Sequence, residues 1–224
     1  CRFYCGYPMT PSTGVMTYMA AKSKEMGIVV DQVEDEVAAL NMALGASYAG
    51  VRAMTGSSGG GFALMVEALS LAGMIETPVV IVNAQRPAPA TGLPTRTEQS
   101  DLRFMIHAGH GEFPRIVIAL RDPKDAFYQT ARAFNLADKY QIPVILLIDK
   151  HLADYKISID RYLADGNGLK DGEYKRFKLT EDGISPRLIP GKVKGQTVLV
   201  SSDEHDEKGH ITESSTMRVA MVNK

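Results

Sequence analysis

Short runs of β-branched and apolar residues alternate with longer segments of helical period through the first 153 residues of the chain. A strand buried on both faces is a short apolar run, whereas a helix repeats its apolar positions every three to four residues. This alternation is typical of a sheet whose two faces are both covered by helices. We therefore predict a doubly wound α/β domain over residues 1–153, built on a mostly parallel six-stranded sheet.

The individual elements follow from the same patterns. The predicted strands are residues 2–6, 28–32, 51–55, 78–82, 115–119 and 142–148, and the predicted helices are residues 12–26, 34–50, 62–74, 100–107 and 123–140. The last helix has the clearest start. Asp122 can cap it, Pro123 has the dihedral favoured at the first helical position, and Asp125 complements the helix dipole.

The composition changes after residue 153. Residues 154–195 are rich in Gly, Asp and Lys, which predicts an extended arm of turns and short strands. Residues 196–224 combine a short apolar run with an acidic stretch and are expected to lead into a following domain. The region 154–224 is thus an arm and linker, and we interpret the chain as a fragment of a longer protein.

Charge and cysteine content exclude several functions. The 25 Lys and Arg residues nearly balance 26 Asp and Glu residues, so no basic surface for nucleic acid or membrane is expected. No apolar run reaches the roughly 18 residues that span a bilayer, and no signal peptide opens the chain, so we expect a cytoplasmic protein. Cys1 and Cys5 cannot supply the four thiolates of an iron–sulfur cluster, so any such cluster must lie on another chain.

Ligands of a parallel sheet gather at the carboxyl ends of its strands, so the segments that follow the strands are the candidate site. In the first, residues 6–13, two prolines and several hydroxyls lie beside a helix N-terminus that could bind an anion. The alternative is that Ser12 or Thr10 only caps the helix. In the second, residues 34–36 are three carboxylates, which ordinarily complement a helix dipole but are candidates for catalysis.

The third segment is the glycine-rich turn of residues 55–61, which allows a ligand to approach the backbone closely. It lacks the lysine of a phosphate-binding Walker loop. Its G-x-S-x-G pattern also fits a serine hydrolase with Ser58 as nucleophile, helped by Asp149 and His205. A plain tight turn explains it equally well.

The fourth segment ends in Arg86, directly after an apolar strand. A guanidinium there could clamp a carboxylate through two hydrogen bonds, or it could simply lie in solvent with its stem on apolar surface. His205 and His210 stand among acidic residues, but their spacing favours a solvated acidic loop, so no metal site is predicted.

Together these segments resemble the α subunit of the thiamine-dependent 2-oxoacid:ferredoxin oxidoreductases, specifically its pyrimidine-binding domain. The resemblance covers nearly the whole chain. The matching blocks are G-Y-P-M-T-P-S-T at residues 6–13, the helix of residues 34–50, residues 55–67, the loop of residues 86–101, G-H-G-E-F-P at residues 109–114 and the acidic residues 202–213.

The resemblance implies a role for individual residues. Glu36 corresponds to the glutamate that hydrogen-bonds the N1′ atom of the aminopyrimidine of thiamine diphosphate, with Glu34 as the alternative. Thr10 and Arg86 correspond to the residues that hold the substrate carboxylate. The further residues that line the cofactor are Tyr7, Pro8, Ser58 and Gly59.

The resemblance also implies partners. The reaction is oxidative decarboxylation of a 2-oxoacid to an acyl-CoA and CO₂, with electrons passed to ferredoxin. A separate β subunit would supply the diphosphate and Mg²⁺ site and the iron–sulfur cluster, in a heterodimer or a dimer of heterodimers. The acidic block resembles 2-oxoglutarate-type or broad-specificity subunits. A third hypothesis is a non-catalytic scaffold subunit that keeps the fold.

Three positions depart from the family pattern. Met9 replaces the usual Ile, Gly14 replaces a common Glu, and Gly60 replaces the usual Pro. The change at Gly60 predicts a looser turn. None of the three affects Glu36, Thr10 or Arg86.

Overall fold

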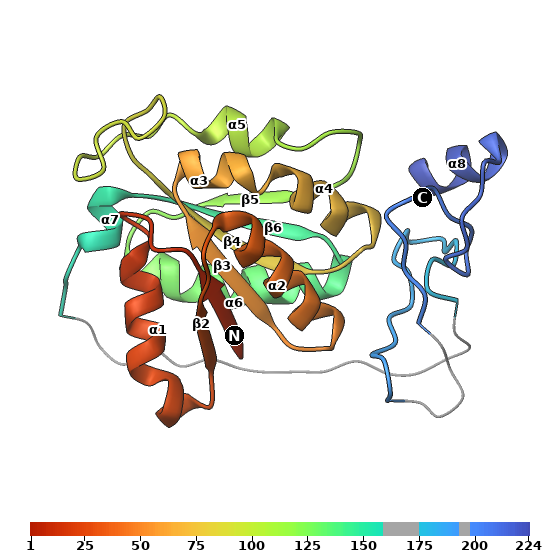
Figure 1. The fold of residues 1–224 in the computed structure, drawn as a ribbon, viewed down its shortest axis with the longest axis horizontal. Coiled ribbons are helices and arrows are strands. Elements are labelled where there is room, and N and C mark those ends of the chain that lie inside the picture. Colours follow the sequence, from red (N-terminus) through yellow and green to blue (C-terminus); the bar gives the residue numbers. More distant parts are fainter. Residues whose placement is uncertain (159–174, 193–197) are drawn as a thin grey trace.

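The computed structural model describes residues 1–158, 175–192 and 198–224. Its centre is a six-stranded sheet in the order β2-β1-β3-β4-β6-β5, in which every pairing is parallel (Figure 1). The strands are β1 (Phe3–Gly6), β2 (Val29–Gln32), β3 (Ala53–Ser57), β4 (Val79–Gln85), β5 (Ile116–Ala119) and β6 (Pro143–Asp149). The predicted six-stranded α/β fold is confirmed, and the sheet is entirely parallel.

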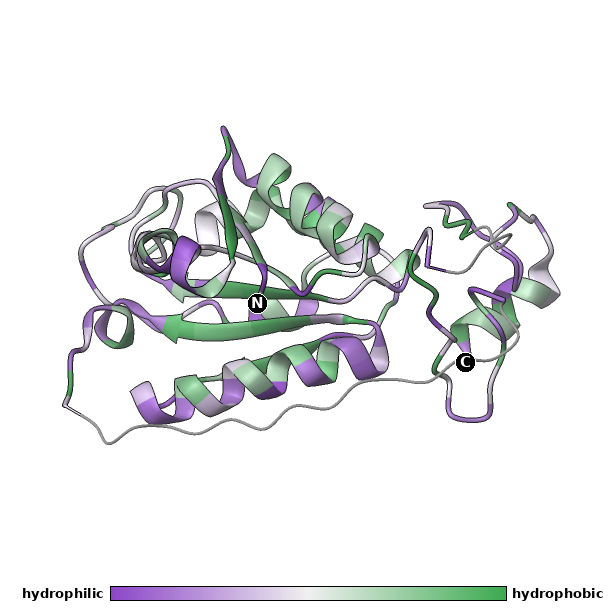
Figure 2. Cartoon of the chain, turned by 90° about the horizontal axis from the view of Figure 1, so that it is seen from below, coloured by the Kyte–Doolittle hydropathy of each residue, from purple (hydrophilic) through white to green (hydrophobic). Residues whose placement is uncertain are grey.

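Helices cover both faces of this sheet. Residues of α1 (Thr13–Met26) and α6 (Pro123–Tyr140) join one buried core, and residues of four other helices join the second. Those four are α2 (Glu36–Tyr48), α3 (Gly59–Leu64), α4 (Val66–Met74) and α5 (Leu102–His107). Because side chains alternate along a strand, β4 gives Val80 and Val82 to the first core and Val79 and Ile81 to the second. The two longest strands, β4 and β6, are accordingly buried along almost their whole length, and Figure 2 shows hydrophobic strands at the centre of the fold.

The direction in which the sheet grows reverses between β1 and β3. The chain leaves β1 through α1 to reach β2 on one side, and returns through α2 to reach β3 on the other. A crevice at the carboxyl ends of the strands forms at such a reversal, and ligands bind there in open α/β sheets. The strand ends at this point are Gly6 and Ser57.

The prediction of one helix over residues 62–74 is wrong. Two helices occupy this region, separated at Met65, whose N–H donates to Phe62 O at 2.9 Å, a shorter i→i−3 step that tightens the turn. The first of them, α3, already begins at Gly59. Since β3 continues to Ser57, the expected turn of residues 55–61 is reduced to Ser58.

The best-marked helix of the sequence forms as expected. The Asp122 carboxylate accepts a hydrogen bond from Asp125 N at 2.8 Å, and α6 has the predicted bounds. By contrast, α7 (Lys150–Asp154), capped by Asp149, was not anticipated and crosses the predicted domain boundary at residue 153. No helix in the described part of the chain is both long and apolar enough to cross a membrane.

Short strands were expected over residues 154–195, and the described residues of this segment, 154–158 and 175–192, contain none. The described residues 198–224 contain one isolated bridge, between His205 and Ile211, and a helix, α8 (Ser215–Val222), whose first turn is capped by Ser214. Residues 159–174 and 193–197 of the predicted arm lie outside the described part of the chain.

The arm packs at the amino-terminal edge of the sheet. Arg176 Nη2 donates to Ile75 O at 2.8 Å and to Glu76 O at 2.6 Å, in the connection that leads into β4. Tyr48, at the end of the helix before β3, donates to Val198 O at 2.9 Å. Figures 1 and 2 both show the arm beyond the end of the sheet. Residues 175–192 and 198–224 thus lie at the edge opposite the candidate site, whereas residues 154–156 of the arm stay at the carboxyl edge, beside residues 95–97.

Candidate active site at the carboxyl edge of the sheet

The segments that follow β1, β3 and β4 touch one another. A Cβ added to Gly56 would lie 2.6 Å from Ser12 Oγ, so β3 contacts the segment that follows β1. A Cβ added to Gly60 would lie 3.3 Å from Ala90 O, so α3 contacts the loop that follows β4. Three of the four segments singled out in the sequence thus meet at the reversal of the sheet, and the helix of the fourth, α2, packs against α3.

Glu36 lies in this meeting place as the first residue of α2. Its side chain is only 3% exposed, and Ser57 Oγ donates to its Oε1 at 3.2 Å. A Cβ at Gly61 would lie 2.3 Å from the same oxygen. The carboxylate can approach the α3 backbone this closely because residue 61 has no side chain.

The neighbouring carboxylates have other environments. Glu34 is exposed, and Asp35 caps α2 by accepting from Ala38 N at 2.7 Å. Since capping is already performed by Asp35, Glu36 is free for another function. The burial of Glu36 favours it over Glu34 as the carboxylate of a site.

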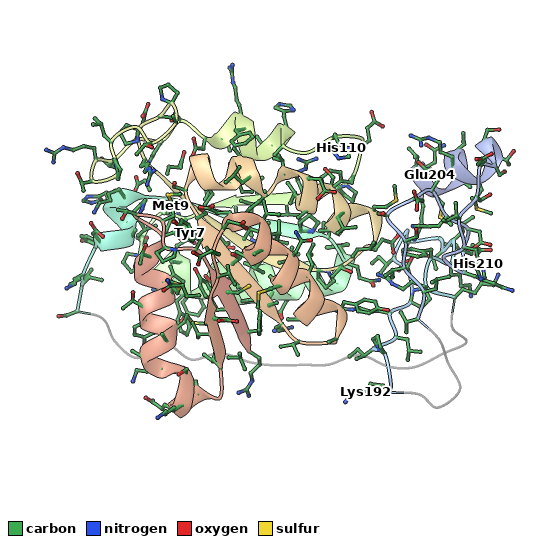
Figure 3. All side chains as sticks on the ribbon, viewed as in Figure 1. Tyr7, Met9, His110, Lys192, Glu204 and His210 are labelled. Carbon is green, nitrogen blue, oxygen red and sulfur yellow. The ribbon has the colours of Figure 1, made fainter. Side chains whose placement is uncertain are left out.

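Thr10 and Arg86 also lie together. Arg86 is buried, and its Nη1 donates to Thr10 O at 2.6 Å. A guanidinium has five donors, so one bond to a carbonyl leaves donors that could reach a carboxylate. Thr10, Tyr7 and Pro8 are exposed at this edge. Figure 3 shows Tyr7 and Met9 in the segment after β1, far from Glu204 and His210 of the arm.

Ser12 does not cap α1, which was one of the simpler interpretations of this segment. Its hydroxyl is buried beside the Tyr4 phenol instead. Three other buried polar atoms of this region have no hydrogen-bond partner among the described residues: Thr55 Oγ1, Ser58 Oγ and Asn83 Oδ1. Buried polar groups normally have partners. Ser58 and Asn83 stand at the carboxyl ends of β3 and β4, where a polar ligand or water can complete their hydrogen bonding.

The serine-hydrolase alternative is not supported by the geometry. Ser58 is fully buried, and Asp149 Oδ1 caps α7. His205 lies at the opposite edge of the sheet, where its Nε2 is 3.2 Å from Met74 O and its ring stacks on Phe177. The three residues therefore do not form a triad. The expectation of a solvated acidic loop is wrong for His205, whose side chain is buried, whereas Asp203 and His210 of that loop are exposed.

The floor of the site is apolar and keeps its titratable groups neutral. Burial raises the pKa of the Tyr4 phenol, which lies beneath Gly56. Burial and the nearby Asp31 carboxylate raise the pKa of the Cys5 thiol to about 12, and its Sγ donates to Ala39 O at 2.8 Å. Neither side chain is ionised at neutral pH, so neither Tyr4 nor Cys5 places a negative charge near Glu36.

Sequence reasoning assigned no role to three residues of this site, Ser57, Asn83 and Asp101. Ser57 and Asn83 are direct partners in the β3–β4 register, and Asn83 Nδ2 donates to Asp101 Oδ2 at 2.9 Å. The sequence did contain a signal for Ser57 and Asn83, because each is a polar residue near the end of an apolar strand. Asp101 follows a long loop of no periodicity, so only the fold reveals its position.

The described residues contain no group of three or more His, Cys, Asp or Glu side chains that could hold a metal ion.

The sequence comparisons agree with the geometry. Residues 1–224 match the family model described as pyruvate flavodoxin/ferredoxin oxidoreductase, thiamine diphosphate-binding. The chain belongs to this family. The membership expected from the sequence is confirmed.

Two curated relatives are longer proteins whose names state an activity. The chain is 48% identical over 245 residues to the 2-oxoacid:ferredoxin oxidoreductase 1 subunit alpha of Sulfurisphaera tokodaii, covering 100% of the chain and 39% of that subunit. It is 40% identical over 217 residues to the 2-oxoglutarate synthase subunit KorA of Methanothermobacter thermautotrophicus, covering 94% of the chain and 57% of the relative. The chain thus spans less than two thirds of each relative.

Solved structures agree with the fold. The 2-oxoglutarate:ferredoxin oxidoreductase from Magnetococcus marinus, with 2-oxoglutarate, coenzyme A and succinyl-CoA bound, matches with a TM-score of 0.87 and 44% identity. The match covers 98% of this chain and 40% of that one. Benzoylformate decarboxylase from Polynucleobacter necessarius matches with a TM-score of 0.56 and 15% identity over 75% of this chain and 30% of that one, which supports the fold alone.

The residues present fit one half of a thiamine diphosphate site. An aminopyrimidine offers ring nitrogens and an amino group, which require a carboxylate and hydroxyl partners in a largely apolar pocket. The buried carboxylate of Glu36 and the unpartnered hydroxyl of Ser58 meet this requirement.

Proposed function

We propose that this chain is the pyrimidine-binding part of an α subunit of a thiamine-diphosphate-dependent 2-oxoacid:ferredoxin oxidoreductase. The reaction is the oxidative decarboxylation of a 2-oxoacid to acyl-CoA and CO₂, with electrons passed to ferredoxin. The observation that carries the proposal is the buried Glu36 carboxylate at the reversal of the sheet, in a chain that belongs to this family. The bound cofactor supplies a nucleophilic carbon and an electron sink.

In this proposal each residue of the chain has a defined task. Glu36 shares a proton with N1′ of the pyrimidine, which is general acid–base catalysis through a fixed carboxylate. Ser57 holds Oε1 of Glu36 by its hydrogen bond. Tyr7, Pro8, Ser58 and Gly59 line the cofactor, and they exclude water from it.

Thr10 and Arg86 bind the carboxylate of the substrate. Arg86 is held beside Thr10 by its bond to the Thr10 carbonyl, and in this proposal its remaining donors and the Thr10 hydroxyl face the same carboxylate. An ion pair in a partly dehydrated site is strengthened by low dielectric constant. This arrangement suits a 2-oxoacid, and 2-oxoglutarate is the first substrate to assay, because two of the relatives are named for it.

The partner subunit completes the site. We propose that a β subunit binds the diphosphate through Mg²⁺ and carries the iron–sulfur cluster, because two cysteines, one of them buried, cannot hold a cluster. The active species is then a heterodimer or a dimer of heterodimers in the cytoplasm. This chain alone is expected to reduce no dye.

The deciding experiment uses the full-length subunit co-expressed with its β subunit. Reduction of a viologen dye is measured with a 2-oxoacid and coenzyme A. Glu36→Gln keeps the shape of the side chain but removes the carboxylate, so we expect kcat to fall by about 10²- to 10⁴-fold. Glu34→Gln, an adjacent exposed carboxylate, is the matched control and should retain activity.

Two outcomes would contradict the proposal. Full activity of Glu36→Gln would favour the scaffold hypothesis, in which another chain performs the chemistry. Stoichiometric labelling of Ser58 by a fluorophosphonate would favour the hydrolase hypothesis.

A further inference from the structure

Asp101 is a buried carboxylate that does not perform the usual task of its position. It stands directly before α5 but makes no side-chain hydrogen bond to the first turn of that helix. It is 7% exposed, and its Oδ2 accepts from Asn83 Nδ2 at 2.9 Å. Its own N–H donates to Gln85 Oε1 at 2.9 Å. The carboxylate is therefore directed at the end of β4 rather than at its own helix.

The same carboxylate touches the glycine-rich start of α3. A Cβ added to Gly59 would lie 2.5 Å from Asp101 Oδ2 and 2.9 Å from its Cγ and Oδ1. On the other side, a Cβ added to Gly61 would lie 2.3 Å from Glu36 Oε1. The backbone of residues 59–61 thus runs between two buried carboxylates, and each contacts a position where a side chain is absent.

None of the ion pairs found among the described residues involves Asp101. A buried carboxyl group needs hydrogen-bond partners that an apolar side chain of similar size would not need. Its presence here therefore points to a function that uses the hydrogen bond to Asn83.

Asp101 also ends the loop of residues 86–100. The loop begins at Arg86, immediately after Gln85, and returns to the sheet at Asp101, where both Gln85 and Asn83 hold it. Gln99 donates to Asp149 Oδ2 at 2.7 Å and ties the same end of the loop to β6. The loop is therefore closed at its base, with Arg86 at one end and Asp101 at the other.

A row of contacts then joins Asp101 to Glu36. Asp101 contacts Asn83, Asn83 is the register partner of Ser57 on β3, and Ser57 donates to Glu36. Register partners of neighbouring strands have side chains on the same face. The row crosses the sheet just below the site.

We propose that Asp101 is a positioning residue, which fixes the loop that starts at Arg86 against the Gly59–Gly61 backbone so that the substrate end and the pyrimidine end of the site keep one geometry. The inference rests on the proposed function of Glu36 and Arg86. In this role Asp101 orients other groups and does not need to contact the substrate.

The test is Asp101→Asn in the full-length subunit assembled with its β subunit. Asparagine keeps the volume but places an amide where the carboxyl group lies against Gly59. Because a misplacement of about 1 Å can cost about 100-fold in rate, we expect kcat to fall by about 10- to 100-fold. The KM for coenzyme A should change less than about twofold, because the change is confined to the thiamine side of the site.

The matched control is Asp122→Asn. Asp122 also precedes a helix, α6, but it caps that helix in the ordinary way and lies on the other face of the sheet. Asparagine caps as well as aspartate, so this variant should behave as wild type.

A second readout does not depend on activity. Hydrogen exchange of the assembled complex should show faster exchange in residues 87–100 for Asp101→Asn but not for Asp122→Asn. Unchanged exchange in this loop would overturn the inference whatever the kinetics. A second result would also overturn the inference: Asp101→Asn keeps the wild-type kcat, although Glu36→Gln abolishes activity in the same complex. If Glu36→Gln is fully active, the proposed function has failed, and the exchange result still decides the role of Asp101 as a tether.

Discussion

At the scale of single residues, the candidate site is shaped by absent side chains as much as by present ones. Glu36 and Asp101 are buried carboxylates, and each reaches the backbone of α3 at a glycine. Neither Gly59 nor Gly61 has a positive φ angle. The requirement for glycine at these positions is therefore close approach, and not an unusual backbone conformation.

Gly61→Ala should consequently damage the site without unfolding the protein. The new methyl group would overlap Ser57 Oγ and Glu36 Oε1, so the carboxylate must move away from the position that the pyrimidine requires. We expect the affinity for thiamine diphosphate and kcat both to fall by about 10-fold or more, which corresponds to a loss of about 1.4 kcal/mol. Titration of the assembled apoenzyme with thiamine diphosphate measures the first, and dye reduction the second.

Gly45→Ala is the control for this substitution. Gly45 lies within α2 and is exposed, and no atom lies within 4 Å of an added Cβ. Alanine in a helix interior is favoured over glycine by up to about 1 kcal/mol, so activity should persist. Equal loss of activity in both variants would mean that the contact with Glu36 is not the cause.

At the scale of helices and strands, local chemistry decided which boundaries the sequence could predict. The bounds of α6 were predictable because Asp122, Pro123 and the amphipathic pattern all favour the same start. The start of α3 at Gly59 was not, because glycine has low helix propensity and the sequence of residues 59–61 favours a turn. In the fold these glycines lie against Glu36 and Asp101, which come from distant parts of the chain.

Asp122→Ala tests how much the local signal contributes. It removes the acceptor for Asp125 N and should destabilise the first turn of α6 by about 1 kcal/mol. Amides in that turn should then exchange hydrogen about 5-fold faster. Asp122→Asn retains an acceptor and should exchange at the wild-type rate. Equal rates in all three proteins would show that packing on the sheet holds this turn without the cap.

At the scale of the whole molecule, the two edges of the sheet have different surroundings. The carboxyl edge gathers Glu36, Thr10 and Arg86, whereas the arm covers the amino edge. The sequence predicted an arm but could not place it. Its contacts depend on Arg176 and His205, which resemble ordinary polar residues of a charged segment until the fold brings Met74–Glu76 against them.

Arg176→Ala should therefore release the arm and leave the site intact. The guanidinium is 4% exposed and donates to the carbonyls of Ile75 and Glu76 and to the Glu76 carboxylate at 3.3 Å. Its loss leaves buried acceptors unpaired, which costs about 1–3 kcal/mol. Hydrogen exchange in residues 175–192 and 198–224 should accelerate, because local opening governs exchange there. The kcat should stay within about twofold of wild type, because Arg176 lies at the edge opposite Glu36.

The neighbouring Lys175 provides the control. It pairs with Glu207 inside the arm at 3.2 Å, and both side chains are partly exposed, so Lys175→Ala should cost at most about 1 kcal/mol. Exchange at the arm should then remain near wild type. If Arg176→Ala loses activity in proportion to its gain in hydrogen exchange, the arm and the site are coupled through the sheet. The division into a catalytic carboxyl edge and an amino edge that holds the arm would then have to be abandoned.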